Sequence, residues 1–290
     1  MRQQDILKHS LQVLTSEQRR FYFDNGYLLV ERCLDDDTVN RLRVAMTDLI
    51  ERAETQSDCP RDFEFETTTK GRHLRQVLCA ADHHPDLWDY ARGPIMTELA
   101  ADLVGPDVMF REATISFKSP GGRGFDWHQD IVFFPSSNLS PLMMLTFLED
   151  VTMDMGPTRV IPGTHRGPVF DHYDSQGNWL GLIGEHHKKH LCDDEAVDVT
   201  GPAGSILVTN CALVHSALPN HSVSRRPMVI MGYQSADAIS YTDIPYQSRH
   251  KWEIVRGVPS PYVHTEAYEL KMPPDWAEHK GIRIDNLYQQ

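Results

Sequence analysis

The clearest indication of chemistry is the segment Trp127-His128-Gln129-Asp130, in which an imidazole and a carboxylate stand two residues apart. On an extended backbone such residues project to one face, so we expect His128 and Asp130 to lie side by side while Gln129 points away. An imidazole and a carboxylate held together can bind one metal ion. The segment therefore predicts two ligands of a metal site.

A third ligand is expected on a later strand, and His215 is the best candidate, because it follows the β-favouring run at 205–209. Two histidines and one carboxylate on one face of an octahedron leave open positions, which is the ligand set of non-haem Fe(II) oxygenases. Zinc is more often held in a closed tetrahedral site. A His-x-Asp triplet also arises by chance, and a lone histidine on an apolar strand is usually a hydrogen-bonded core residue.

Arg226 supports the metal hypothesis, because it enters the apolar strand Met228-Val229-Ile230-Met231. A buried arginine is costly unless it is paired, and its planar fork suits a carboxylate. A co-substrate with a free carboxylate near the metal would supply that partner. The alternative is a surface cation, and Arg225 could take the inward role instead, since neighbouring strand residues face opposite sides.

Composition excludes several classes of protein. The 28 Lys+Arg against 41 Asp+Glu give a formal charge of −13, which disfavours a nucleic-acid partner. The five cysteines are scattered, which argues against a disulfide framework and a zinc ribbon. The sequence shows neither a signal-peptide pattern nor an apolar run long enough to span a bilayer. We therefore expect a soluble, cytoplasmic protein without a membrane partner.

The elements that would position these groups fall into three regions. Residues 1–105 are predicted to form a mostly helical support, with a capping box at Thr15–Gln18, a short strand at 27–31 and an irregular segment at 57–70. The next region, 106–235, carries short β-favouring runs between Gly/Pro turns, which indicates a jelly roll. Strands are expected at 108–117, 131–134, 142–148, 159–161, 205–209 and 228–233.

Two further segments are expected to lie over the β core. The polar, His-rich segment 171–197 interrupts the strand rhythm and predicts a lid-like insertion over one end of the barrel. Residues 236–290 are predicted to form a loop-rich, aromatic C-terminal tail. No repeat divides the chain, so 1–290 is treated as a single domain.

The order and spacing of these pieces resemble the phytanoyl-CoA dioxygenase-like (PhyH-type) branch of Fe(II)/2-oxoglutarate-dependent oxygenases. The resemblance runs from about residue 14 to about residue 235. The matching pieces are Leu14-Thr15-Ser16-Glu17-Gln18, Asn25-Gly26-Tyr27, Trp127-His128-Gln129-Asp130, Gly156-Pro157-Thr158-Arg159-Val160-Ile161-Pro162-Gly163-Thr164-His165, and His215 followed by Arg226.

The resemblance implies an α+β fold with a mainly β core, a double-stranded β-helix of the cupin-like jelly-roll type with N-terminal helices packed on it. It implies a single oxygenase domain in which the catalytic residues His128, Asp130 and His215 bind Fe(II). Arg226 would hold the co-substrate 2-oxoglutarate through its distal carboxylate, and O2 would be the second co-substrate. Because Asp130 is present, a halide-binding variant is disfavoured.

The sequence departs from the family pattern beside Arg226. Many relatives carry Ser or Thr two residues after the distal histidine, where this chain has Ala217, with Ser216 one residue earlier. Another polar group is therefore expected to help Arg226, and Ser116 and Thr158 are candidates for co-substrate binding.

Other aromatic and histidine residues are less decisive. Phe134 corresponds to a position that can hold an aromatic ring near the co-substrate, and a plain core role fits it equally well. His165 belongs to a Pro-Gly-Thr-His turn that is expected to be structural. His186, His187 and His190 are expected to lie in a solvated stretch.

The function implied is oxidation, most often hydroxylation, of an unactivated C–H bond in a mid-sized apolar small molecule of specialised metabolism, with release of succinate and CO2. Desaturation, epoxidation or rearrangement on the same iron stays open, as does the oligomeric state. A cupin-type metal hydrolase or isomerase is one alternative, and it would tolerate loss of Arg226. A non-catalytic ligand-binding barrel is the other.

Overall fold

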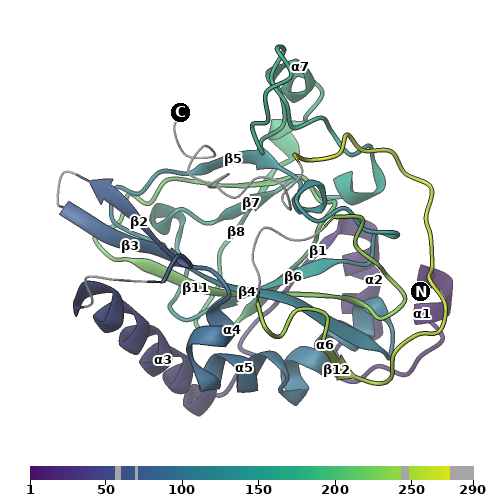
Figure 1. Ribbon diagram of the computed structural model, residues 1–290, viewed down its shortest axis with the longest axis horizontal. Helices are drawn as coiled ribbons and strands as arrows, with labels where there is room; N and C mark the ends of the chain where they lie inside the picture. The colour runs from purple at the N-terminus through teal and green to yellow at the C-terminus, as the bar shows by residue number, and fades with distance from the viewer. Residues whose placement is uncertain (56–59, 69–70, 243–247, 275–290) are drawn as a thin grey trace.

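Two antiparallel sheets make up the core of the protein (Figure 1). The computed structural model describes residues 1–55, 60–68, 71–242 and 248–274. The larger sheet has eight strands in the order β1-β9-β6-β11-β4-β3-β2, with β12 paired to β4, and the smaller has the order β5-β10-β7-β8. The strands are β1 Tyr27–Val30, β2 Phe63–Thr68, β3 Gly71–Val77, β4 Val108–Lys118, β5 Phe125–His128, β6 Leu142–Phe147, β7 Thr158–Val160, β8 Val197–Val199, β9 Ile206–Asn210, β10 His215–Ala217, β11 Arg226–Ser235 and β12 Ile254–Arg256.

Helices α3 to α6 lie along one face of the larger sheet, and the smaller sheet lies on the other side (Figure 1). This arrangement confirms the predicted mainly β jelly roll with N-terminal helices packed on it. The α-helices are α1 Gln3–Ile6, α2 Ser16–Asn25, α3 Asp36–Thr55, α4 Ala80–His83, α5 Pro85–Ala91, α6 Pro94–Val104 and α7 Glu185–Lys188. The short 3-10 helices are η1 Asp130–Val132, η2 Met153–Met155, η3 Thr164–Arg166 and η4 Asp193–Glu195.

Alternate side chains of β11 pack on opposite faces of the larger sheet, one facing the helices and the other facing the smaller sheet. Val229 and Met231 pack in the cluster beneath the helices, whereas Met228 and Ile230 pack on the side of the smaller sheet. Period-2 alternation puts Arg226 on the same inner face as Met228. The strand therefore carries its arginine into the space between the two sheets.

The N-terminal elements follow their sequence signals closely. Thr15 and Gln18 form the predicted capping box, since each backbone N–H donates to the other side chain. Gly26 ends α2 with φ +80°, a left-handed conformation that glycine adopts at little cost. The strand that follows, β1, pairs with β9 at the edge of the larger sheet.

Two local expectations are wrong. The predicted strand at 131–134 is a 3-10 turn, because the chain bends after Asp130 and the Phe133 N–H donates to the Asp130 carbonyl. The segment expected to be irregular at 57–70 contains β2, which pairs with β3. The alternating Phe63-Glu64-Phe65-Glu66 carries the period-2 signal for that strand. The N-terminal region thus adds strands to the larger sheet as well as helices.

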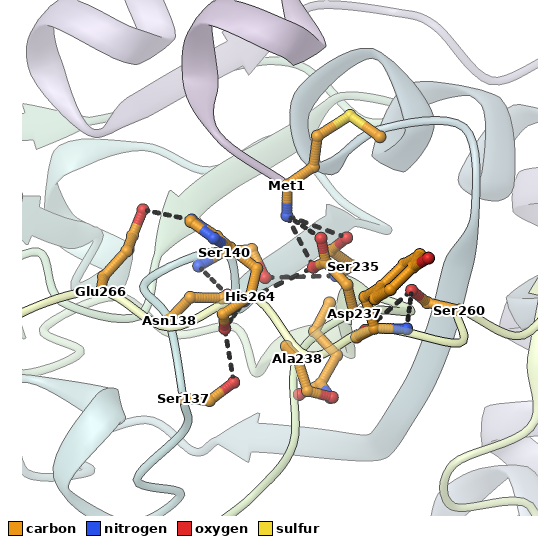
Figure 2. Close-up of polar contacts among 12 residues, drawn as sticks. Met1, Ser137, Asn138, Ser140, Ser235, Asp237, Ala238, Ser260, His264 and Glu266 are labelled. Atoms are coloured by element: carbon orange, nitrogen blue, oxygen red, sulfur yellow. Dashed lines mark hydrogen bonds and ion pairs between the residues drawn. The ribbon is translucent and has the colours of Figure 1, made fainter.

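The C-terminal tail is tied to the loop that precedes β6 (Figure 2). The Ser137 hydroxyl and the Asn138 side-chain amide both donate to the His264 carbonyl, at 2.9 and 3.1 Å. The Met1 ammonium lies 2.6 Å from Asp237 just after β11. The described part of the tail is therefore anchored to the core, while residues 243–247 and 275–290 of the predicted tail lie outside the described residues.

The described residues contain no helix that is both long and apolar enough to cross a membrane.

Candidate metal centre

Three predicted ligands meet where the smaller sheet faces the larger one. His128 ends β5 and His215 begins β10, and the two residues are direct partners in the antiparallel register. Asp130 follows β5 as the first residue of η1. Gln129 between them has φ −129° and ψ 126°, so the backbone stays extended through the motif. This is why His128 and Asp130 share one face, as the His-x-Asp spacing predicts.

The geometry of the three side chains fits a divalent metal ion. One ligand atom from each of His128, Asp130 and His215 can be chosen so that all lie within 4.8 Å of one another. The Nε2 atoms of His128 and His215 lie 3.6 and 3.7 Å from the two Asp130 carboxylate oxygens. The donor set, two imidazole nitrogens and a carboxylate beside an open cavity, is the one that suits non-haem Fe(II).

Each histidine is oriented by a hydrogen bond from its other ring nitrogen. His128 Nδ1 lies 2.9 Å from the Asp126 carbonyl, and His215 Nδ1 lies 3.0 Å from the Leu213 carbonyl. A carbonyl can only accept, so both Nδ1 atoms carry the proton and both Nε2 atoms keep a lone pair. Such outer hydrogen bonds fix the tautomer that a metal requires.

Burial shapes the protonation of these groups. Desolvation and the neighbouring His215 lower the pKa of His128 well below its usual value, so its ring is neutral and ready to bind a metal. Desolvation raises the pKa of Asp130, while the charges of His215 and Arg111 oppose that rise. A divalent cation at this position would favour the ionised carboxylate.

A polar network behind the motif was not anticipated from the sequence. The Gln129 side chain points away from the metal ligands and donates to the Pro168 and Ala212 carbonyls at 3.2 and 2.7 Å. The Gln129 backbone N–H donates to Nε2 of His172 at 3.0 Å. His172, 1% exposed, thereby holds the backbone between the two ligands. Its only sequence signal is its place in the His-rich 171–197 segment.

A cavity of about 250 Å³ opens beside the three ligands. Apolar side chains from both sheets and from the turn after β5 form much of its wall, including Phe133, Phe134, Met143, Leu145, Met228 and Ile230. Polar side chains also line it, among them Glu112, Thr114, Ser116 and Lys118 of β4, Arg226 of β11, and Glu66, Arg75 and Gln76 of β2 and β3. The site is thus an apolar pocket with a few placed polar groups, as small-molecule sites usually are.

Arg226 lies in this cavity wall and is 4% exposed. Among the described residues, neither its Nε nor its Nη1 has a hydrogen-bond partner. Burial lowers its pKa to about 10, so the guanidinium stays charged at neutral pH. A buried cation with unused donors calls for an anionic partner, and a carboxylate of 2-oxoglutarate suits it. Arg225 is only partly buried and does not line the cavity.

The other predicted co-substrate residues also line the cavity. Ser116 pairs with Met228 and Thr158 pairs with Ala217, which places both close to the strand ends that carry Arg226 and His215. Ser216 and Phe134 line the wall as well. Their roles in binding stay predictions.

Lys118 is a cavity residue that the sequence did not single out. It pairs with Arg226 across β4 and β11, and its Nζ donates to the Gly156 and Leu218 carbonyls at 3.1 and 2.5 Å. Burial and the Arg226 charge lower its pKa to about 6. Lys118 therefore joins the turn before β7 to the segment after β10, at one end of the smaller sheet and next to the arginine.

The remaining histidines singled out in the sequence do not join the metal ligands. His165 Nε2 contacts the Phe23 carbonyl at 3.1 Å, which ties the Pro-Gly-Thr-His turn to α2. His186 and His187 belong to α7, which projects from the molecule (Figure 1). His190 is exposed.

Comparisons with known proteins agree with this site. A family model described as phytanoyl-CoA dioxygenase (PhyH) matches residues 22–228. The chain is 28% identical over 229 residues to a probable alpha-ketoglutarate-dependent hypophosphite dioxygenase from Stutzerimonas stutzeri, covering 77% of this chain and 79% of that protein.

Solved structures share the fold. The apo form of EctD from S. alaskensis has a TM-score of 0.72 at 20% identity, covering 88% of this chain and 92% of that one. The non-heme alpha ketoglutarate dependent carbocyclase SnoK from nogalamycin biosynthesis has a TM-score of 0.64 at 23% identity, covering 88% of this chain and 100% of that one. At these identities the two structures support the jelly-roll architecture alone.

Proposed function

This chain belongs to the phytanoyl-CoA dioxygenase family, and from that premise we propose that it hydroxylates an unactivated C–H bond of a mid-sized, mainly apolar small molecule. It is an Fe(II)/2-oxoglutarate-dependent dioxygenase with O2 as the second co-substrate. One observation carries the proposal: His128, Asp130 and His215 converge beside a cavity whose wall also holds the buried Arg226. Succinate and CO2 are the co-products of the proposed reaction.

Each residue of the site has a separate task in this proposal. When bound, iron supplies the activation of O2 that C–H oxidation requires. His128, Asp130 and His215 hold the metal, and Arg226 binds the distal carboxylate of 2-oxoglutarate. Many relatives carry a Ser or Thr hydroxyl at the position of Ala217. In this chain the hydroxyls of Ser116 and Thr158 are proposed to assist Arg226 instead. Phe133 and Phe134, both buried, keep water from the reacting centre.

The lining of the cavity supports an apolar body for the substrate. Phe133, Met143, Met228 and Ile230 offer it apolar contacts. SnoK is named as an enzyme of nogalamycin biosynthesis, and by analogy we place this chain in specialised metabolism. The hypophosphite dioxygenase is named for a small inorganic anion, so the substrate range of the family is wide.

We also propose that residues 171–197 act as a lid. The Tyr173 hydroxyl donates to the Met272 carbonyl at 2.6 Å, and Lys271 lies 3.9 Å from the Tyr173 ring centroid. Asp171 faces Lys271 at 3.4 Å. These contacts join the insertion to the C-terminal tail. They support the proposal that the two segments together cover one end of the barrel.

Arg226→Met tests the co-substrate assignment. Loss of a charge-assisted hydrogen bond to a carboxylate costs about 1.5–3 kcal/mol, so the KM for 2-oxoglutarate should rise roughly 10- to 100-fold. Succinate release, stimulated by metabolites from a screening library, is the measurement. Arg225→Met is the matched control and should leave KM unchanged. Equal KM values for the Arg226 variant and the wild type would contradict the assignment, whereas no succinate release from the wild type with any metabolite would favour a cupin-type hydrolase or isomerase.

A further inference from the structure

Arg111 is a buried guanidinium that the proposed chemistry does not use. It is 1% exposed, and none of its three nitrogen atoms has a hydrogen-bond partner among the described residues. Within the same described part of the chain it forms no ion pair with a carboxylate. A buried, unpaired guanidinium is strongly unfavourable, because its charge has left water without a replacement for the lost hydrogen bonds. The side chain therefore calls for an anionic partner that enters the protein from outside.

The backbone turns Arg111 toward the cavity side of the larger sheet. Gly232 of β11 pairs with Glu112 and Tyr233 pairs with Phe110, so Arg111 is the extra residue of a β-bulge. A Cβ added to Gly232 would lie 3.0 Å from Glu112 Cγ and 3.5 Å from Arg111 Cβ. Both side chains thus leave β4 next to Gly232. The strand alternation places Gly232 on the inner face.

Arg111 lies directly behind the cavity wall beside the metal ligands and is not itself a lining residue. Its Cζ lies 4.9 Å from the centroid of the Phe134 ring, and Phe134 and Glu112 both line the cavity. Its charge is close enough to Asp130 to oppose the rise of the Asp130 pKa. A divalent metal ion would add positive charge here, which increases the need for a negative group beside Arg111.

The partner of Arg111 is distinct from the carboxylate that Arg226 is proposed to bind. Arg226 pairs with Lys118, which lies seven residues from Arg111 along β4. At about 3.3 Å per residue the two strand positions are roughly 20 Å apart, which favours two separate anions over one short 2-oxoglutarate chain. The two side chains therefore start from opposite ends of the inner face.

We propose that Arg111 binds an anionic group, a carboxylate or a phosphoryl group, of the primary substrate. The inference rests on the proposed function, because it takes the cavity beside the metal ligands as the substrate site. The substrate would then have an apolar body against Phe133 and Met143 and an anionic end beside Phe134. Glu112, also without a partner for Oε1 among the described residues, lies beside Arg111, and burial raises its pKa to about 7 while the Arg111 charge opposes the rise.

The test uses the protein loaded with Mn(II) and saturating 2-oxoglutarate, so that Arg226 is occupied. The melting temperature is followed as sodium acetate, inorganic phosphate or the neutral acetamide is added. We expect acetate or phosphate to raise the melting temperature of the wild type, with acetamide inactive, and the difference between acetate and phosphate identifies the anion class. In Arg111→Met the apparent Kd for that anion should rise at least about tenfold.

The melting temperature without added anion shows whether Arg111 has a structural role apart from anion binding. Removing an unpaired buried charge should leave the melting temperature of Arg111→Met unchanged or higher. Arg111→Lys keeps the charge but loses the planar fork, so its anion effect should be weaker than that of the wild type. Equal anion effects in wild type and both variants, or no effect of acetate or phosphate on the wild type, would overturn the proposal.

Failure of the two proposals can be told apart on the same samples. The visible charge-transfer band of the anaerobic Fe(II)/2-oxoglutarate complex reports the proposed function, and Arg111→Met should retain that band. A missing band in the wild type would overturn the proposed function. An anion effect that disappears in Arg111→Met would still locate the anion at Arg111.

Discussion

His172 shows how a residue outside the metal ligands can set their geometry. Its Nε2 accepts from the Gln129 N–H, and its Nδ1 lies 2.8 Å from the Phe170 carbonyl, which must accept. The ring is therefore neutral with the proton on Nδ1. Because Gln129 stands between His128 and Asp130, this single contact links the start of the 171–197 segment to the metal-binding motif.

The neutral state of His172 gives the protein a pH-dependent stability. Burial lowers the pKa of His172 from 6.5 to about 4. Between these values the unfolded chain binds a proton that the folded protein does not, so the free energy of unfolding falls as the pH falls. The contribution is fully present above about pH 6.5 and amounts to roughly 3 kcal/mol at most. Urea unfolding between pH 7 and pH 4 measures it.

His172→Gln is the matched variant, because its amide can still accept from Gln129 but does not titrate. The loss of stability between pH 6.5 and pH 4 should be smaller in this variant than in the wild type. His190→Gln, at an exposed position, should behave like the wild type. The same pH dependence in all three proteins would show that His172 does not contribute.

Residue chemistry could be predicted where it depends on local spacing. The i, i+2 relation of His128 and Asp130 is a property of extended backbone, so the sequence was sufficient. His172 and Arg111 could not be recognised, because their roles depend on a crossing segment and on a β-bulge. Neither the contact between distant segments nor the extra residue in β4 leaves a local pattern.

At the scale of elements, the turn before β7 is constrained by backbone packing. Gly156 has φ +72°, and a Cβ there would lie 2.3 Å from the Leu218 carbonyl oxygen. The Gly156 carbonyl in this turn accepts from Lys118 Nζ. This close approach of two chain segments supports the strand that carries Thr158 and lies beside the His215 strand.

Gly156→Ala should therefore destabilise the protein more than a Gly→Ala substitution at a left-handed glycine that has no close neighbour. Gly121 is the matched control, since it has φ +76° with nothing within 4 Å of its Cβ position. Gly121→Ala should cost about 1–2 kcal/mol from the backbone alone. Gly156→Ala adds a backbone clash and should cost at least about 3 kcal/mol. Equal costs in chemical unfolding would show that the contact with Leu218 can relax.

Long, strongly patterned elements were the predictable ones. Val108–Lys118 and Arg226–Ser235 carry apolar runs bounded by turn residues, and α2 has its capping box. The three-residue strands β8 and β10 are too short for periodicity to reveal, whereas β7, of the same length, was predicted because Gly/Pro turns bound it on both sides. The run at 131–134 has strand composition, but it packs under the cavity as a turn, so tertiary contacts override its local preference.

At the scale of the whole molecule, the tail fixes the loop between η1 and β6. The Ser136 N–H donates to the Tyr268 hydroxyl at 3.1 Å, and that hydroxyl donates to the Ser136 carbonyl. Ser137 and Asn138 bind the His264 carbonyl in the same region (Figure 2). The loop follows Phe134, so these contacts connect the tail to the wall of the cavity.

Tyr268→Phe should lower the free energy of unfolding by about 1 kcal/mol or more, because it leaves the Ser136 groups without their partner. Tyr262→Phe is the control, since Tyr262 is 80% exposed and its hydrogen bonds with Ser260 involve only its backbone. Thermal unfolding of the two variants beside the wild type provides the comparison. An equal shift in both variants would mean that the tail contact adds nothing to stability.

The most direct test of the metal assignment is an anaerobic titration of the purified protein with Fe(II) and 2-oxoglutarate. Chelation of the co-substrate to iron held by His128, Asp130 and His215 should produce a visible charge-transfer band. The band should be lost in Asp130→Ala and retained in the control Asp126→Ala, whose carboxylate lies outside the ligand set. Absence of the band in the wild type, or its persistence in Asp130→Ala, would contradict the account.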